Sequence, residues 1–247
     1  ASMAKTSSAP VWSLVSRYLQ VQDKIRRTMK TIKYIIALLA AIPFLSSCDD
    51  HIYEDASWHA WRPGMVYCTN GEVMSYEDCA KQGNIPEAVL FYVDNQGVIS
   101  GKAYAVSLKN YSEKEFIDPD TIYFEQGTSA DIEKFDGEEN TIVLRYFQIA
   151  SPIAKNVTPK FFIPSVAEMY KLYLAKSIVN STIEQCGGDL LPIDKEDCWY
   201  WTSTEVAGAA QDRAWRYSLT SGRFEAADKH SQFATRPIIS IRLNKEE

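Results

Sequence analysis

The 247-residue chain carries 32 acidic and 26 basic residues, which gives a formal net charge of −6. The basic residues gather near the start, so residues 48–247 hold 19 Lys and Arg against 31 acidic residues, a net charge of −12. Nucleic acids and anionic lipids bind clustered basic residues, so neither is expected as the main partner. Residues 48–247 are long enough for one domain that buries roughly 70% of its unfolded surface, although two small domains would also fit.

The first element in chain order, residues 29–48, has the pattern of a secretion signal. Lys30 and Lys33 precede an apolar stretch, residues 34–45, which is shorter than the ~20 residues of a membrane-spanning helix. Leu45-Ser46-Ser47-Cys48 resembles the lipobox of bacterial lipoproteins, in which the cysteine is acylated and becomes the mature N-terminus. The resemblance implies a lipid anchor at Cys48 in the outer membrane, facing the cell surface. A buried core helix is the alternative.

Cys48 also sets the expected division of the chain. We expect a non-native upstream segment, a signal peptide, a lipidated acidic tether and one folded domain, at residues 1–28, 29–47, 48–57 and 58–247. The two acidic residues after Cys48 resemble the surface-export signals of Bacteroidetes-type lipoproteins. A plain solvated linker explains them equally well.

Four cysteines remain for the domain: Cys68, Cys79, Cys186 and Cys198. Outside the cytoplasm they are expected to form disulfides, and four cysteines allow three pairings. The short spacings favour Cys68–Cys79 and Cys186–Cys198, each worth about 3 kcal/mol if unstrained. A zinc site is the less favoured alternative, because the chain has no Cys-x-x-Cys and no histidine near these cysteines.

The first half of the domain reads as strands followed by a long loop. Residues 64–68 predict a strand, the apolar run 88–93 predicts a strand buried on both faces, and residues 102–108 return as its partner. Residues 110–140 are acidic with scattered Gly and Pro, which predicts a long surface excursion. Residues 141–149 predict another short element.

The clearest helix follows Pro164. Ser165 and Glu168 form a capping box, and the helix should run to about Val179 or Asn180. Residues at helical spacing predict a core face: Val166, Met169, Tyr170, Tyr173 and Ile178.

After Cys198 the pattern becomes that of strands. We expect them at residues 199–204, 214–219, 223–226 and 235–243, with a turn at 220–222. Strands, one capped helix and a further group of short strands predict an α+β domain.

Several of these motifs resemble a bacterial family with a C-type-lectin-like fold. Its members include the C-terminal domain of the Legionella collagen-like adhesin, the Fibrobacter paralogous domain and variable proteins of Bacteroides diversity-generating retroelements. The resemblance covers about residues 62–243. At the front, Gly64-Met65-Val66-Tyr67-Cys68 and Leu90-Phe91-Tyr92-Val93 resemble the openings of Bacteroides lipoproteins of this group. The other matching segments are Phe161-Phe162-Ile163-Pro164-Ser165, Glu168-Met169, Leu172-Tyr173, Tyr200-Trp201-Thr202-Ser203-Thr204-Glu205, Ala214-Trp215, Ser221-Gly222 and Arg236-Pro237-Ile238-Ile239. The resemblance implies a C-type-lectin-like fold, with short mixed and antiparallel strands and one capped helix before the C-terminal strands.

Catalysis and metal binding have weaker support. Asp228 and His230 could join a serine in a catalytic triad, but an exposed polar loop is the simpler interpretation. Formylglycine-generating enzymes share the lectin-like fold, yet they need reactive cysteines in a groove. Glu205, Asp212, Glu225 and Asp228 could supply oxygen ligands to calcium, although a solvated acidic loop explains them better. We therefore expect no enzyme activity, no cofactor and no metal.

A binding surface is the remaining interpretation of residues 205–232. In the diversified relatives, the corresponding stretch is the one that varies. Exposed Trp, Tyr and Arg provide most of the binding energy at many interfaces. The predicted ligand contacts are Glu205, Gln211, Asp212, Arg216, Tyr217, Arg223, Glu225, Lys229 and His230, whereas Trp215 could equally belong to the core.

These contacts predict a non-catalytic adhesin or receptor that binds an extracellular protein or glycan. The alternative is a structural or tip subunit of a surface appendage or envelope assembly. A formylglycine-generating-type enzyme ranks third.

Overall fold

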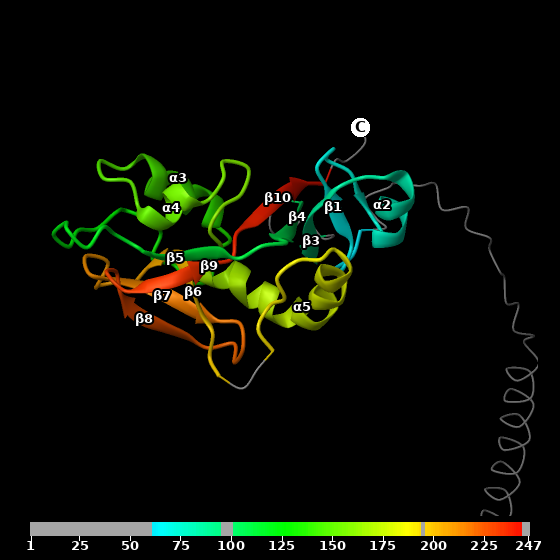
Figure 1. The fold of residues 1–247 in the computed structure, drawn as a ribbon. Coiled ribbons are helices and arrows are strands. Elements are labelled where there is room, and N and C mark those ends of the chain that lie inside the picture. Colours follow the sequence, from blue (N-terminus) through cyan, green and yellow to red (C-terminus); the bar gives the residue numbers. More distant parts are fainter. Residues whose placement is uncertain (1–60, 95–100, 194–195, 244–247) are drawn as a thin grey trace, which may run out of the picture. The chain divides into compact units, whose positions relative to one another are not determined.

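The computed structural model describes residues 61–94, 101–193 and 196–243 (Figure 1). These residues belong to one unit of the chain, Asp55–Glu247, and the other unit, Ala1–Glu54, lies outside them. The predicted signal peptide, Cys48 and the tether up to residue 57 therefore fall outside the described residues.

The first sheet is antiparallel and has five strands, in the order β10-β4-β3-β1-β2. Its strands are β1 (Val66–Cys68), β2 (Val73–Met74), β3 (Pro86–Val93), β4 (Lys102–Ser107) and β10 (Ile238–Arg242). The predicted strand 88–93 and its partner are confirmed. Val89 and Phe91 pack in one core cluster and Ala88 and Leu90 in another, which explains the continuous apolar run of β3.

The second sheet has the order β5-β9-β6-β7-β8. Its strands are β5 (Tyr111–Glu115), β6 (Trp199–Glu205), β7 (Arg213–Ser218), β8 (Phe224–Asp228) and β9 (Gln232–Thr235). The β6–β9 contact is parallel and the other pairs are antiparallel. The predicted strands around the 220–222 turn are therefore confirmed.

The predicted closing strand 235–243 is confirmed as β10, which begins three residues later than predicted, whereas Thr235 belongs to the other sheet. β9 ends at Thr235 in the second sheet, and β10 begins at Ile238 in the first. Between them, Pro237 lacks an amide hydrogen for a strand ladder. Arg236 is buried there and donates to Asn110 Oδ1 at 2.9 Å and to the Asp189 carbonyl at 2.8 Å.

Four helices occur among the described residues: α2 (Tyr76–Gln82), α3 (Gly137–Tyr146), α4 (Pro152–Asn156) and α5 (Val166–Gln185). The capping box of α5 is confirmed, since the Ser165 amide donates to Glu168 Oε2 at 2.7 Å and the Glu168 amide donates to Ser165 Oγ at 3.4 Å. The helix continues beyond the predicted end. Tyr170 and Ile178 were predicted as core residues, but about half of each is exposed.

The predicted surface excursion at 110–140 is confirmed in part, since residues 116–136 contain no helix or strand and most of them are not buried. It contains β5 and the first turn of α3, and it buries Phe116, Ile117 and Gln126. The polar composition of this segment gave no sign of these buried residues, because Phe116 and Ile117 pack against residues from distant parts of the chain.

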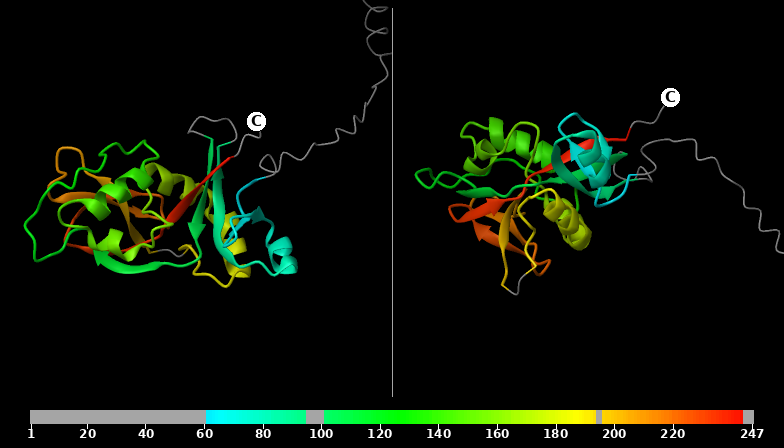
Figure 2. Two further views of the ribbon diagram at one scale, coloured as in Figure 1. Left: turned by 90° about the horizontal axis from the view of Figure 1, so that it is seen from above. Right: turned by 45° about the vertical axis from the view of Figure 1, so that its right-hand side comes forward.

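The helices and sheets form layers around two large core clusters, and a third, small cluster contains Val66, Cys68 and Cys79. Buried residues of α5 pack with one face of the first sheet and with Tyr200 and Tyr217 of the second sheet. Residues of α3 and α4 pack against the opposite face of the first sheet. Figures 1 and 2 show α5 on one side of the sheets and α3 and α4 on the other. The domain is thus a mixed α+β fold with few helices, as the sequence predicts.

Candidate functional site

One face of β6, β7 and β8 carries a group of stacked aromatic and charged side chains. In the strand register, Arg216 lies opposite both Trp201 on β6 and Glu225 on β8. Because side chains alternate along a strand, Trp199 shares the face of Trp201. We call this group the arginine cluster: Asp197, Trp199, Arg216, Arg223, Glu225 and Phe233.

Arg216 lies at the centre of the arginine cluster. Its guanidinium carbon lies 4.1 Å from the ring centre of Trp199 and 5.0 Å from that of Phe233. Its Nη2 donates to Glu225 Oε2 at 2.9 Å, and 25% of its side chain is exposed. Stacking and ion pairing therefore fix a half-buried guanidinium in one orientation.

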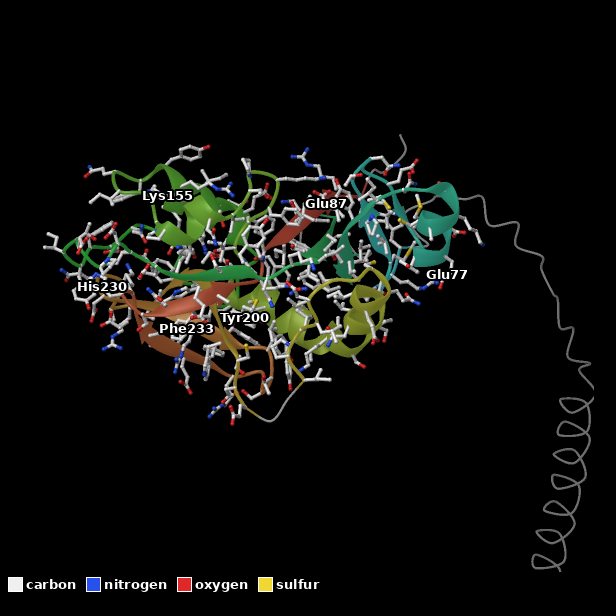
Figure 3. All side chains as sticks on the ribbon, viewed as in Figure 1. Glu77, Glu87, Lys155, Tyr200, His230 and Phe233 are labelled. Carbon is white, nitrogen blue, oxygen red and sulfur yellow. The ribbon has the colours of Figure 1, made fainter. Side chains whose placement is uncertain are left out.

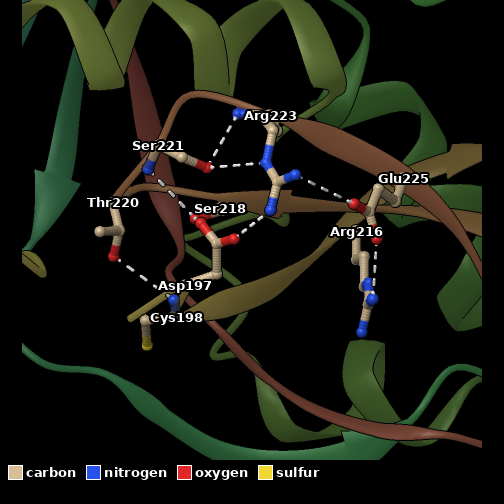
Figure 4. Close-up of polar contacts among 8 residues, drawn as sticks. All are labelled: Asp197, Cys198, Arg216, Ser218, Thr220, Ser221, Arg223 and Glu225. Carbon is tan, nitrogen blue, oxygen red and sulfur yellow. Dashed lines mark hydrogen bonds and ion pairs between the residues drawn. The ribbon is translucent and has the colours of Figure 1, made fainter. Parts of the chain in front are cut away.

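Arg223 forms the outer part of the cluster, after the tight turn at Gly222 (φ 76°). Arg223 pairs with Asp197, and its Nη1 lies 3.9 Å from Glu225 Oε1 (Figure 4). About 60% of the Arg223 side chain is exposed. Hydrogen bonds from Ser221, Ser218 and Arg223 lower the pKa of Asp197 to about 2, so its carboxylate remains charged at neutral pH. The cluster thus presents an ordered set of charges and aromatic rings.

Two predicted ligand contacts, Glu205 and Lys229, are wrong because the structure buries both completely. Lys229 Nζ pairs with Glu205 Oε1, and it also donates to the Phe124 carbonyl at 3.0 Å and the Ala210 carbonyl at 2.5 Å. Burial lowers the pKa of Lys229. Neither side chain can reach a ligand at the surface.

Glu205 also holds a distant loop against the end of β6. Its carboxylate accepts hydrogen bonds from the Gln126 amide at 2.8 Å and from the Thr128 amide and hydroxyl at 2.8 and 2.9 Å. The buried pair therefore fastens residues 124–128 to the second sheet.

Tyr217 is a third predicted contact that is absent from the outer face. It is 1% exposed and packs in the core cluster beside α5, on the opposite face of β7 from Arg216. Its hydroxyl has no hydrogen-bond partner in the described part of the protein. Tyr217 therefore lies in the core, on the opposite face of the sheet from the arginine cluster.

Gln211, Asp212 and His230 form another group near the other end of the hairpin. The Gln211 side chain donates to the Tyr123 carbonyl at 3.4 Å, and Asp212 pairs with Arg213 at 3.5 Å. His230 stacks on Tyr123 with ring centres 4.2 Å apart. Figure 3 shows His230 apart from Phe233 and Tyr200. The nine predicted contacts therefore do not form one patch.

The Asp228–His230 pair lacks the geometry of a catalytic dyad. Asp228 accepts a hydrogen bond from the His230 backbone amide at 2.9 Å, and its carboxylate also accepts from the Tyr123 hydroxyl at 3.0 and 2.9 Å. His230 Nε2 is buried without a hydrogen-bond partner among the described residues. No serine hydroxyl is joined to this imidazole in the hydrogen bonds of the described residues.

Neither predicted disulfide, Cys68–Cys79 or Cys186–Cys198, is formed, because all four cysteines are free thiols. The sulfurs of Cys68 and Cys79 lie 3.3 Å apart, beyond the bond length of about 2.05 Å. Cys186 packs against these two residues, whereas Cys198 is exposed and its amide donates to Thr220 Oγ1 at 3.3 Å. Burial and the neighbouring Cys79 raise the pKa of Cys68 to about 12, and burial raises that of Cys186 to about 11. Both buried thiols are therefore protonated at neutral pH.

Within residues 61–94, 101–193 and 196–243, no group of three or more His, Cys, Asp or Glu could hold a metal ion. No helix in these same ranges is long and apolar enough to cross a membrane.

Sequence reasoning missed three members of the arginine cluster as site residues: Asp197, Trp199 and Phe233. The alternation of Trp199 and Trp201 along β6 could have placed Trp199 beside Arg216. Nothing local indicated Phe233, because its strand joins the sheet from beyond a separate turn.

No known protein family matches the chain, and no curated protein is significantly similar to it.

Proposed function

We propose that the protein is a lipid-anchored, surface-exposed adhesin or receptor that binds an extracellular protein or glycan through the arginine cluster. The observation that carries the proposal is the contact of the Arg216 guanidinium with the rings of Trp199 and Phe233, next to the largely exposed Arg223. Interfaces use Arg and Trp as anchors because these residues bring a large contact area. In this proposal the protein is not an enzyme.

The order of elements supports a C-type-lectin-like fold as part of this proposal. The capped helix α5 precedes β6, which contains the Trp-Thr-Ser-Thr segment, and β7 and β8 follow as a hairpin. In the diversified proteins of the bacterial family that this chain resembles, the loops after the corresponding strand form the binding surface.

Ion pairing prepares the cluster for binding at little cost in side-chain entropy. Arg216 and Arg223 are each held by a carboxylate, so fewer rotamers are lost when a ligand is bound. Two arginines and two carboxylates also present both signs of charge, which favours a polar ligand with complementary groups.

A screen against extracellular ligands tests this proposal. The purified protein would be applied to arrays of host glycans and of host surface proteins. We expect saturable binding to a small set of ligands of one class. Binding to none of them would contradict the adhesin or receptor proposal.

The anchor has a separate test. If Cys48 is acylated, the Cys48→Ala variant should leave the membrane fraction, because the lipid chains supply the membrane affinity. Wild-type protein treated in parallel should remain with the membranes. A variant that stays membrane-bound would contradict the lipid anchor.

An assembly subunit is the second candidate, because β8 is an edge strand of the second sheet in the described residues. A free edge can accept a strand from another chain. Phe224 and Ala226 are exposed along it. Self-association that is lost when Ala226 is replaced by proline, without loss of folding, would favour this role.

A further inference from the structure

A pocket of about 450 Å³ lies between the first turns of α5, the segment 132–135 and the β7–β8 hairpin. Its walls are mainly apolar and aromatic, and they include Ile132, Phe135, Val166, Tyr170, Tyr217 and Phe224. This volume falls within the range of about 300–1,000 Å³ found for small-molecule sites. Since Tyr217 and Arg216 point to opposite faces of β7, the pocket is separate from the arginine cluster.

Tyr217, one of the residues that line the pocket, has a buried hydroxyl without a hydrogen-bond partner among the described residues. The residue as a whole is 1% exposed. Burial, together with the neighbouring hydroxyls of Tyr173 and Tyr170, raises the pKa of Tyr217, so the group keeps its proton and remains a donor. An unsatisfied buried donor costs about 1–3 kcal/mol, which a bound acceptor would recover.

Lys171 adds a positive charge to the pocket wall. Its ammonium lies 5.0 Å from the ring centre of Tyr92, and no ion pair involves it in the part of the chain that the structure describes. Exposed Glu133 is the acidic residue at the pocket. An anionic group could therefore approach Lys171 while a ring occupies the apolar wall.

We propose that this pocket binds a small aromatic molecule that carries an anionic hydrogen-bond acceptor, such as a carboxylate or sulfonate. The ring of the ligand packs against Phe135 and Phe224. Its anionic group accepts a hydrogen bond from the Tyr217 hydroxyl and faces Lys171. Aromatic walls favour a planar ring, since offset and edge-to-face contacts add to apolar burial. The site is independent of ligand binding at the arginine cluster.

Fluorescence titration with 8-anilinonaphthalene-1-sulfonate, which has aromatic rings and a sulfonate, tests the site. Ala167 also lines the pocket, so Ala167→Phe should fill it and weaken binding at least tenfold. Tyr217→Phe removes only the hydroxyl and should weaken binding about threefold to tenfold, since a neutral hydrogen bond contributes modestly. Lys171→Met should have a similar effect.

Ser177→Phe is the matched control for Ala167→Phe. Ser177 lies exposed on the same helix and does not line the pocket, so this variant should bind the probe as wild type does. Arg216→Ala should also leave probe binding unchanged, which separates this site from the proposed function. Thermal unfolding of each variant checks folding. If Ala167→Phe does not fold, the affinity of Tyr217→Phe for the probe provides the test.

Absence of saturable binding to the wild-type protein would overturn the proposal. Equal affinity in Tyr217→Phe and wild type, or in Ala167→Phe and Ser177→Phe, would do the same.

Discussion

The arginine cluster and the Glu205–Lys229 pair contain the same kind of contact in different surroundings. Arg216 and Glu225 leave 25% and 42% of their side chains exposed, whereas Lys229 and Glu205 are 0% exposed. Both pairs come from the stretch that sequence reasoning assigned to ligand binding. The comparison teaches that a charged residue in a polar segment can either bind a ligand or stabilise the fold. Exposed charged residues are available to a ligand, whereas completely buried ones stabilise the fold.

Energetics make this difference measurable. An exposed ion pair contributes about 0–1 kcal/mol, because water and salt screen it. Removing one partner of a buried pair costs about 3–5 kcal/mol, because the other charge is left without compensation. The arginine cluster should thus affect binding more than stability, and the buried pair should do the reverse.

The largest expected effect is that of Lys229→Met. The substitution leaves the Glu205 carboxylate buried without its cation, so the free energy of unfolding should fall by about 3–5 kcal/mol. Urea denaturation measures this loss. The matched control is Arg213→Ala, a half-exposed cation on β7, which should cost about 1 kcal/mol or less.

A double variant sharpens the same test. Glu205→Gln together with Lys229→Met removes both charges, so it should lose less stability than the sum of the single variants. Additive losses of the free energy of unfolding, or a loss below about 1 kcal/mol for Lys229→Met, would contradict the conclusion that this buried pair stabilises the fold.

Glu168 extends the comparison to a buried carboxylate that pairs with no cation among the described residues. It is 1% exposed, and burial raises its pKa to about 8. The folded state therefore keeps a proton that the unfolded state loses above about pH 4.5. This contribution to stability is fully present below the unfolded pKa and is lost as the pH rises toward 8.

The Glu168→Gln variant retains a carbonyl oxygen that can accept from the Ser165 amide, but it cannot titrate. Between pH 5 and 8, wild-type stability should fall relative to this variant by up to about 1.4 kcal/mol per pH unit. Urea denaturation across this range measures the difference. Parallel curves for the two proteins would mean that Glu168 does not titrate in this interval.

The smallest expected effect on stability belongs to the arginine cluster. Arg216→Ala and Arg223→Ala should each lower the free energy of unfolding by about 1 kcal/mol or less, since both side chains are partly exposed. Thermal and urea unfolding provide the measurement. A loss of about 3 kcal/mol for either variant would make the cluster a structural feature and would remove its contrast with the buried pair.

Local sequence signals predicted much of the fold. The capping box at Ser165 and Glu168 places the start of α5, because it satisfies amides within a single turn. The apolar run of β3 and the turn between β7 and β8 are similarly local. The later start of the closing strand at Ile238, with Thr235 in the other sheet, was not predictable in this way, because it depends on where Arg236 finds buried partners far along the chain.

The site was predicted only in part, for the same reason. Arg216, Arg223 and Glu225 lie on one face, as their residue types and hairpin position suggested. Lys229 has the same polar character, yet its partners are carbonyls of Phe124 and Ala210 and the carboxylate of Glu205. Sequence near Lys229 contains no sign of those contacts, so its burial could not be predicted.

The most direct test of the central claim compares binding profiles on the glycan and surface-protein arrays. The Arg216→Ala/Arg223→Ala double variant is measured against wild type and Arg213→Ala. Truncating interface anchors typically costs about 2 kcal/mol or more, so we predict that the double variant binds every wild-type ligand at least tenfold more weakly. Arg213→Ala should keep the wild-type profile. Undiminished binding by the double variant would contradict recognition through the arginine cluster.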